Sequence, residues 1–136
     1  MLNGVVTSKL EHLETTVQHL ESLPPLSQER LQDWILRSAV ERNLHVLVET
    51  MLDICHRLIS WIQAVPATSG RQALERCESF GVLKQASRYF PLVGLRNIVV
   101  HEYRAVDPRI LEEVVNLKLG DLRLFAREVQ DFVAQQ

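Results

Sequence analysis

The sequence predicts an all-α fold, an up-and-down bundle of about five helices. Gly and Pro are sparse, with five of each in 136 residues, and aromatic residues make up 6% of the chain, which favours helices over strands. Apolar residues recur at spacings of three and four along most of the chain, as on one face of a helix. A hydrophobic content of 46% suffices for one core, so we expect a single domain over residues 1–136.

The first expected helix ends before Pro24 and Pro25, because two consecutive prolines cannot continue a helix. Its apolar stripe consists of Leu10, Leu13, Val17 and Leu20. This spacing gives an amphipathic helix with one buried face.

A long helix follows, which we expect Ser27 to cap and which runs to about Ile62 without Gly or Pro. Two adjacent apolar stripes follow this helix, one of Val40, Leu44, Leu47, Met51, Ile54, Leu58 and Trp61, the other of Val48, Leu52, Cys55, Ile59 and Ile62. So wide an apolar face belongs in a bundle core, and it leaves area that a partner could cover.

A loop from Val65 to Gly70 separates the long helix from a short one that ends near Gly81. Thr68 and Ser69 are the alternative caps of this short helix. A further helical segment extends from about Lys84 to Glu102, and Pro91 either kinks it or marks its true start.

The last part of the chain contains two more helices. Asp107 followed by Pro108 is a strong start signal for a helix that extends to about Leu117. Gly120 and Asp121 are expected to break the chain before a final helix, whose inner face carries Leu122, Phe125, Val129 and Phe132 or Val133.

Composition excludes several classes of function. A net charge of −2 argues against a protein that coats nucleic acid through positive potential, so any RNA contact must come from a local site. Cys55 and Cys77 have no C-x-x-C spacing and are expected to be buried core residues rather than zinc ligands. No stretch has the roughly 18 uncharged apolar residues of a membrane span, and the N-terminus has no signal-peptide pattern, so we expect a cytoplasmic protein with no membrane association.

Polar residues interrupt an otherwise apolar helix between Gly94 and Tyr103. At 100° per residue, one row carries Arg96 and Tyr103, and the adjacent row carries Asn97 and His101. The core-facing side would carry Leu95, Ile98 and Val99. The two polar rows therefore face one groove.

This set of side chains can cleave RNA by attack of its own 2′-hydroxyl group. His101 can transfer protons near neutral pH, and Arg96 can hold the phosphate and stabilise its developing charge. Asn97 can orient the imidazole or hold a phosphate oxygen. This chemistry needs no metal and no cofactor.

Spacing alone also fits a hydrogen-bonded core histidine and a solvated arginine. Arg96 and His101 are about 140° apart around a helix, so joint action needs the long reach of Arg96 or a second copy of the helix across a dimer interface.

The run R-N-I-V-V-H-E-Y resembles the R-x-x-x-x-H-x-Y signature of the HepT family of HEPN-domain toxins. The stretches Ala39–Leu44 and Met51–His56 resemble that family's long second helix, and Phe80–Leu83 resembles the turn before its motif helix. Asp107 and Phe125 also fit, and the resemblance extends from about Glu29 to Val133.

The resemblance implies a HEPN helical bundle that forms a homodimer along the long helix and the motif helix. Arg96 and His101 would be the catalytic pair of a metal-independent endoribonuclease toxin, supported in the cleft by Asn97, Asp53 and Arg42. Tyr103 would be the residue to which a partner nucleotidyltransferase antitoxin of the MNT type transfers AMP. A bulky anionic nucleotide at this position would fill the groove and repel RNA phosphate.

Two alternatives of other classes stay open at this point. The chain could be a non-catalytic subunit that binds a nucleotide or presents a substrate to a nucleotidyltransferase. Its negative net charge is compatible with contact to a protein partner as well as with contact to RNA. Alternatively, His45, Glu49, Asp53 and His56 share one face of the long helix and resemble half of a carboxylate metal site. Such a site needs ligands from other helices, and the sequence contains no Glu-x-x-His pair elsewhere.

Overall fold

The computed structural model describes the backbone of residues 2–101 and 107–136, together with the side chains of residues 4–95 and 107–136. Within these residues the chain is helical and contains no strand. The α-helices are α1 (Leu2–Glu21), α2 (Trp34–Trp61), α3 (Gly70–Ser79), α4 (Phe90–His101), α5 (Pro108–Glu113) and α6 (Leu119–Ala134). Short 3-10 turns at Arg30–Gln32 and Ala86–Tyr89 precede α2 and α4, and a π-helical turn at Val114–Lys118 joins α5 to α6.

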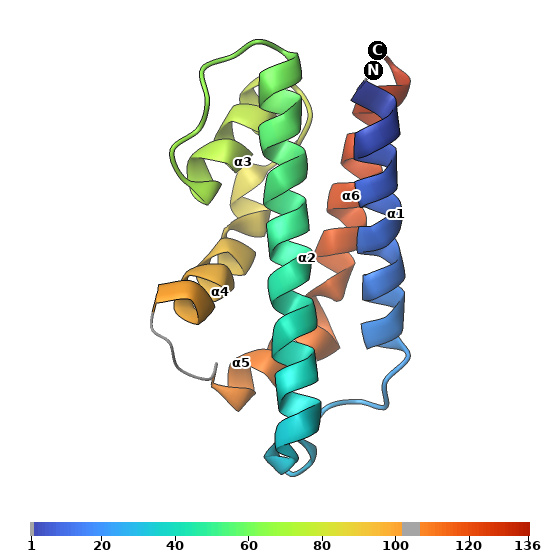
Figure 1. The fold of residues 1–136 in the computed structure, drawn as a ribbon, viewed down its shortest axis with the longest axis vertical. Helices are drawn as coiled ribbons and strands as arrows, with labels where there is room; N and C mark the ends of the chain where they lie inside the picture. Colours follow the sequence, from blue (N-terminus) through green and yellow to red (C-terminus); the bar gives the residue numbers. More distant parts are fainter. Residues whose placement is uncertain (1, 102–106) are drawn as a thin grey trace.

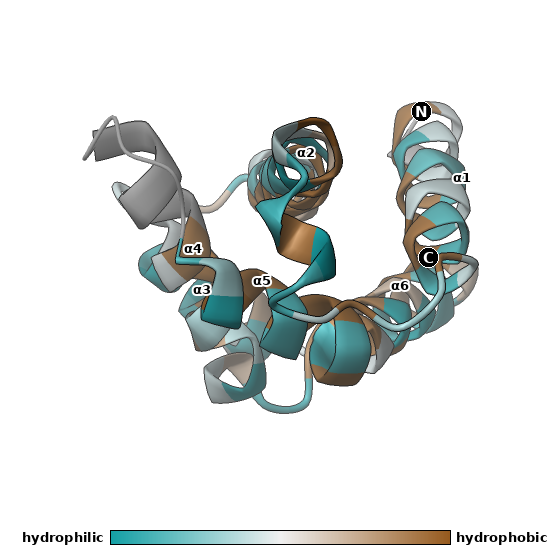
Figure 2. Cartoon of the chain, turned by 90° about the horizontal axis from the view of Figure 1, so that it is seen from below, coloured by the Kyte–Doolittle hydropathy of each residue, from teal (hydrophilic) through white to brown (hydrophobic). Residues whose placement is uncertain are grey.

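The long helix α2 is the central element of the bundle (Figure 1). Helices α1 and α6 lie on one side of it, and α3 and α4 lie on the other; the view along the bundle shows the same division (Figure 2). α1 descends and α2 rises; the short helix α3 slants upward beside the upper half of α2, α4 then descends, and the run from α5 through α6 rises again. Over the described residues this is the predicted all-α, up-and-down bundle, with α5 and α6 forming one continuous helical run that brings the number of helical units to five.

The apolar stripes predicted from sequence form the core. Their most completely buried members come from three helices: Leu13 and Val17 of α1, Met51, Ile54 and Leu58 of α2, and Leu122, Phe125 and Val129 of α6. Cys55 and Cys77 are both buried, as expected. Trp61 departs from the pattern because it lies in the last turn of α2, where the residue is 44% exposed and its ring packs edge-to-face against Phe132.

The predicted start of the long helix is wrong. Ser27 accepts a hydrogen bond from the amide of Arg30 (3.2 Å) and so caps the preceding 3-10 turn. α2 begins at Trp34, because Asp33 has extended backbone angles and its carboxylate accepts hydrogen bonds from the amides of Ile35 and Leu36.

The structure decides the questions left open around α3 and α4. Ser69 caps α3, accepting a hydrogen bond from the amide of Gln72 (3.1 Å). Gly81 follows α3 with a φ of 81°, in the left-handed region where glycine carries no Cβ penalty. Pro91 lies in the first turn of α4, where its missing N–H costs nothing, so it marks the start of this helix rather than a kink.

The C-terminal region confirms one expected boundary and corrects another. Asp107 caps α5, with Pro108 at its first position, as predicted. The expected break at Gly120 is absent: the π-helical turn Val114–Lys118 continues α5 into α6, and Gly120 lies in the first turn of α6. No helix in the described part of the chain is long and apolar enough to cross a bilayer.

Candidate active site

The helix α4 carries the predicted catalytic residues in its last two turns. Arg96, Asn97 and His101 are all part of this helix, and the structure describes their backbone but not their side chains. Tyr103 lies outside the described residues. His101 is five positions after Arg96, which places them about 7.5 Å apart along the axis and about 140° apart around it.

The motif helix is packed against both α2 and α3. Leu92, Val93 and Leu95 of α4 are buried, whereas Pro91 and Gly94 on its other side are exposed. Leu95 therefore faces the core as predicted, and the side chains of Ile98 and Val99 lie outside those described.

Gly70, the first residue of α3, lies where the three helices meet. A Cβ atom built on Gly70 would lie 3.0 Å from Leu52 of α2 and 3.0 Å from Val93 of α4. The absence of a side chain at this position allows α4 to lie close to α2.

The two predicted supporting residues on α2 are not brought together. Asp53 forms ion pairs with Lys9 of α1 (2.7 Å) and with Arg57 one turn later (3.2 Å). Partial burial acts to raise the pKa of Asp53, but the hydrogen bonds and charges of Lys9 and Arg57 outweigh it, and the pKa lies below its ordinary value. Arg42 is exposed, about 16 Å from Asp53 along the helix, and forms no ion pair with any residue that the structure describes. Their supporting roles stay predictions.

The structure gives no support for a metal site among the side chains of residues 4–95 and 107–136. No three histidine, cysteine, aspartate or glutamate side chains there are arranged to hold a metal ion. Glu49, Asp53 and His56 do line one hollow of about 250 Å³ beside the N-terminus of α3, but the carboxylate of Asp53 is paired with Lys9 and Arg57.

Sequence reasoning considered His45 only as a possible metal ligand, whereas the structure places it on the side of α2 that faces α4. It lies two turns before Leu52, which packs beside Val93 at Gly70. α4 descends in Figure 1 while α2 rises, so His45 is displaced from Leu52 in the direction in which α4 continues past Val93. Its Nδ1 atom is buried and has no hydrogen-bond partner among the side chains that the structure describes. No sequence signal reveals a buried nitrogen atom of this kind, so the structure adds His45 to the candidate residues at this site.

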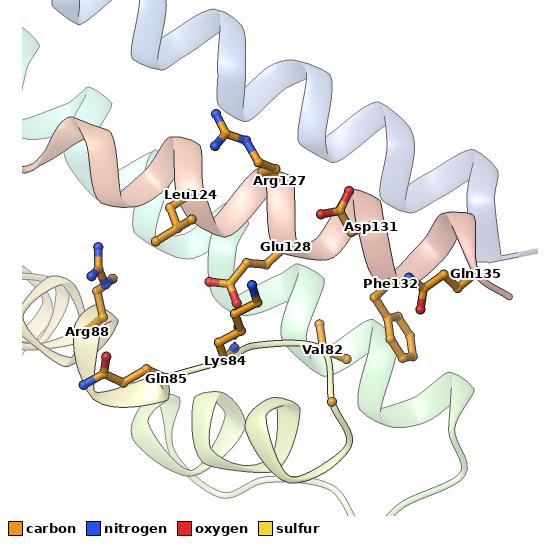
Figure 3. A pocket seen from close by; sticks show the side chains of 11 residues that line it. Val82, Lys84, Gln85, Arg88, Leu124, Arg127, Glu128, Asp131, Phe132 and Gln135 are labelled. Carbon is orange, nitrogen blue, oxygen red and sulfur yellow. Dashed lines mark hydrogen bonds between the residues drawn. The ribbon is translucent and has the colours of Figure 1, made fainter.

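A pocket of about 600 Å³ lies at the other end of α4, between the segment that precedes this helix and α6. Lys84, Gln85 and Arg88 border it on one side, and α6 supplies the opposite wall, as Figure 3 shows. Glu128 extends from α6 across this space toward the backbone of Lys84 (Figure 3). Both cationic and carboxylate side chains line this pocket, so the sign of its charge does not favour one class of ligand.

Comparison with known families gives a match over most of the chain. Residues 13–129 match the family described as "Ribonuclease HepT-like". The matched segment includes all of α2, α3 and α4, and it also contains residues 96–103, which carry the predicted motif.

Two characterised relatives are nucleases. The chain is 22% identical over 132 residues to the "tRNA nuclease HepT" of Aphanizomenon flos-aquae, covering 95% of this chain and 90% of that protein. It is 24% identical over 126 residues to the "mRNA nuclease HepT" of Shewanella oneidensis, covering 91% of this chain and 95% of that one.

A solved structure has the same fold. It is described as a tri-AMPylated Shewanella oneidensis HEPN toxin in complex with an MNT antitoxin. It superimposes with a TM-score of 0.84 at 23% identity, covering 95% of this chain and 98% of that one. The similarity extends over the entire bundle.

Proposed function

Because the chain belongs to the Ribonuclease HepT-like family, we propose that it is the toxin of a HEPN/MNT toxin–antitoxin pair and cleaves RNA without a metal through Arg96 and His101. The observation that carries this proposal is the run from Arg96 to Tyr103, which begins in α4 within the segment that matches the family. The substrate and the antitoxin suggest a cytoplasmic protein.

The proposed reaction uses the 2′-hydroxyl group of the RNA itself as the nucleophile. A base removes the proton of this hydroxyl as the 2′-oxygen bonds to phosphorus, and an acid gives a proton to the 5′-oxygen as its bond to phosphorus breaks. The products are a 2′,3′-cyclic phosphate and a 5′-hydroxyl end. His101 is the proton-transfer group, and Arg96 stabilises the charge on the phosphate. Asn97 orients the imidazole or holds a phosphate oxygen.

We further propose a homodimer along α2 and α4 that completes this site. The angular separation of Arg96 and His101 suits a cleft to which two copies of α4 contribute. Trp34 and Ile35 are adjacent in the first turn of α2 and are 66% and 63% exposed, so this end of α2 carries two neighbouring apolar side chains that a second copy could cover. Gly94 leaves open space on the exposed side of α4. Light scattering should give twice the mass of the chain, and Trp34→Ser with Ile35→Ser should shift the protein toward monomer if this end of α2 is covered. A wild-type monomer at micromolar concentration would contradict the dimer.

The antitoxin is proposed to be a nucleotidyltransferase that transfers AMP to Tyr103. The support is the solved relative, which is AMPylated and bound to an MNT antitoxin. AMP would place a phosphate and a bulky nucleoside two residues from His101, where both would oppose the binding of RNA. Mass spectrometry after co-expression should show added AMP on the wild-type chain and none on Tyr103→Phe.

The substrate is proposed to be cellular RNA, with tRNA and mRNA as the two classes that the relatives suggest. Sequencing of the 5′-hydroxyl ends produced in cells separates these classes. Ends concentrated in tRNA would favour the first relative's activity, and ends spread over messages would favour the second's.

Growth in cells tests the proposal as a whole. Expression of the wild-type chain without its antitoxin should arrest growth, and Arg96→Ala or His101→Ala should relieve the arrest at equal protein level. Arg42→Ala is a test of the supporting role, with partial relief expected. If both motif variants stay as toxic as the wild type, Arg96 and His101 do not carry the activity. If the wild type is harmless but binds nucleotides and the nucleotidyltransferase, the binding-subunit alternative replaces the toxin.

A further inference from the structure

The segment that leads into the motif helix α4 is bound by a carboxylate of the C-terminal helix α6. Tyr89, the last residue before α4, is fully buried, and its hydroxyl donates a hydrogen bond to Oε1 of Glu128 on α6 (2.5 Å). The other oxygen of Glu128 accepts a hydrogen bond from the backbone amide of Lys84 (2.6 Å). One side chain of α6 thus binds the segment before α4 at two points five residues apart.

Packing around the Tyr89 ring fixes the same position. The ring meets Phe125 of α6 edge-to-face, with centroids 5.6 Å apart and planes at 82°. Burial, followed by the hydrogen bond to the Glu128 carboxylate, raises the pKa of Tyr89, so the hydroxyl remains a donor throughout the physiological range.

Helix α3 holds the start of α4 from a second direction. Oε1 of Glu78 accepts a hydrogen bond from the amide of Ala86 (2.7 Å). Phe90 is the first residue of α4, and the guanidinium of Arg71 lies 4.3 Å from the centre of its ring. Hydrogen bonds to carboxylates are among the stronger ones in proteins, so the start of α4 is fixed by charge-assisted contacts from both α3 and α6.

We propose that Glu128 and Tyr89 are positioning residues for RNA cleavage, because their hydrogen bond sets the direction in which α4 carries the motif. This inference rests on the proposed function, in which Arg96 and His101 act from the far end of α4. Neither Glu128 nor Tyr89 is placed in contact with RNA. They act through the helix.

Because α4 is long, the position of His101 at its end is sensitive to how the start of the helix is held. His101 lies twelve residues after Tyr89, about 18 Å along a helix. Over that length a tilt of about 3° displaces the Cα atom of His101 by about 1 Å. A misplacement of about 1 Å can lower a catalytic rate on the order of 100-fold. A small loosening at Tyr89 would therefore reach the reacting groups.

The test compares Tyr89→Phe with a matched control, Val129→Ala. The first removes one hydroxyl and keeps the ring that packs on Phe125. The second removes two methyl groups from a fully buried site beside Glu128, which lowers the Tm without touching the hydrogen bond. Glu128→Gln and Glu128→Ala complete the series, because glutamine keeps one acceptor oxygen and alanine keeps none.

The kinetics should separate positioning from stability. At a temperature where every variant is folded, kcat of Tyr89→Phe should fall about tenfold, with KM for RNA within about twofold of the wild type. Glu128→Gln should retain more activity than Glu128→Ala, and Val129→Ala should keep the wild-type kcat. Wild-type kcat in Tyr89→Phe, beside an inactive His101→Ala, would overturn the inference and leave the proposed function standing. An equal loss of kcat in Val129→Ala would also overturn it.

A second readout is independent of activity. Hydrogen–deuterium exchange of the amides in residues 90–101 should be faster in Tyr89→Phe than in Val129→Ala. If the wild type cleaves no RNA, the proposed function fails, and this comparison still decides whether the hydrogen bond orders α4. Equal exchange in the two variants would overturn the inference.

Discussion

Replacing Gly70 with alanine tests how closely the motif helix packs on its neighbours. The new Cβ would lie 3.0 Å from a Leu52 methyl and 3.0 Å from a Val93 methyl. Leu52 can shift its terminal methyl groups, but Val93 is β-branched and has little rotamer freedom. The added atom must therefore displace α4 from α3 and α2 by a few tenths of an ångström.

The expected loss of stability follows from two opposing effects. Overpacking a dense core costs about 1–3 kcal/mol. Alanine recovers up to about 1 kcal/mol, because it restricts the unfolded chain and favours the helix. The net loss is about 1 kcal/mol, which corresponds to a decrease in Tm of roughly 3–5 °C for a domain of this size.

Gly120→Ala is the matched control for Gly70→Ala. It also lies in the first turn of a helix, but nothing lies within 4 Å of its added Cβ, so its Tm should stay the same or rise. Thermal unfolding followed by circular dichroism at 222 nm measures both variants. A Gly70→Ala protein as stable as Gly120→Ala would refute the argument that these three helices meet without spare volume.

Three other substitutions give distinct outcomes. Asp33→Ala should lower the free energy of unfolding by about 1 kcal/mol in urea titrations, because the amides at the start of α2 lose their cap; no change would place the helix start elsewhere. Lys9→Met should cost a few tenths of a kcal/mol at pH 7, since its partner Asp53 is partly exposed. The folded-state pKa of Asp53 is lowered, so this ion pair stabilises the fold fully above the ordinary pKa of 3.8 and is lost as the pH falls through the lowered value. The difference in Tm between the wild type and Lys9→Met should therefore shrink below about pH 4. A difference in Tm that grows in acid would contradict this sign. His45→Leu should raise the free energy of unfolding by about 1 kcal/mol, because it removes a buried nitrogen atom with no partner among the described side chains. The same substitution should reduce RNA cleavage. Unchanged cleavage would remove His45 from the candidate site.

Local patterns in the sequence account for most of the fold. The stripes of α1, α2 and α6 predict the core because an amphipathic helix in a small bundle has one face to bury. The cap at Asp107 is predicted because the capping side chain lies directly before its helix, and the same pattern limits the cap of α3 to Thr68 or Ser69. Where two capping residues compete, local pattern fails: Ser27 and Asp33 both precede α2, and only the path of the chain decides which one caps it.

The break expected at Gly120 failed for a related reason. Glycine weakens a helix by about 1 kcal/mol relative to alanine, which the burial of Leu119 and Leu122 on either side offsets. The π-helical turn at Val114–Lys118 keeps α5 and α6 continuous, so no break occurs at Gly120.

The candidate site is predictable only in part. The order Arg96, Asn97, His101 along one helix is a local pattern, and the structure confirms that this segment is helical. The contact between Tyr89 and Glu128 joins residues 39 positions apart, and that between Lys9 and Asp53 joins α1 to α2. Such pairs depend on how the helices pack, so no local pattern contains them.

Cleavage of total cellular RNA by the purified protein in excess EDTA tests the central claim most directly. The account predicts cleavage by the wild type, with 2′,3′-cyclic phosphate ends, and none by a folded His101→Ala variant. Cleavage that persists in His101→Ala, or that EDTA abolishes, would contradict a metal-independent nuclease acting through His101.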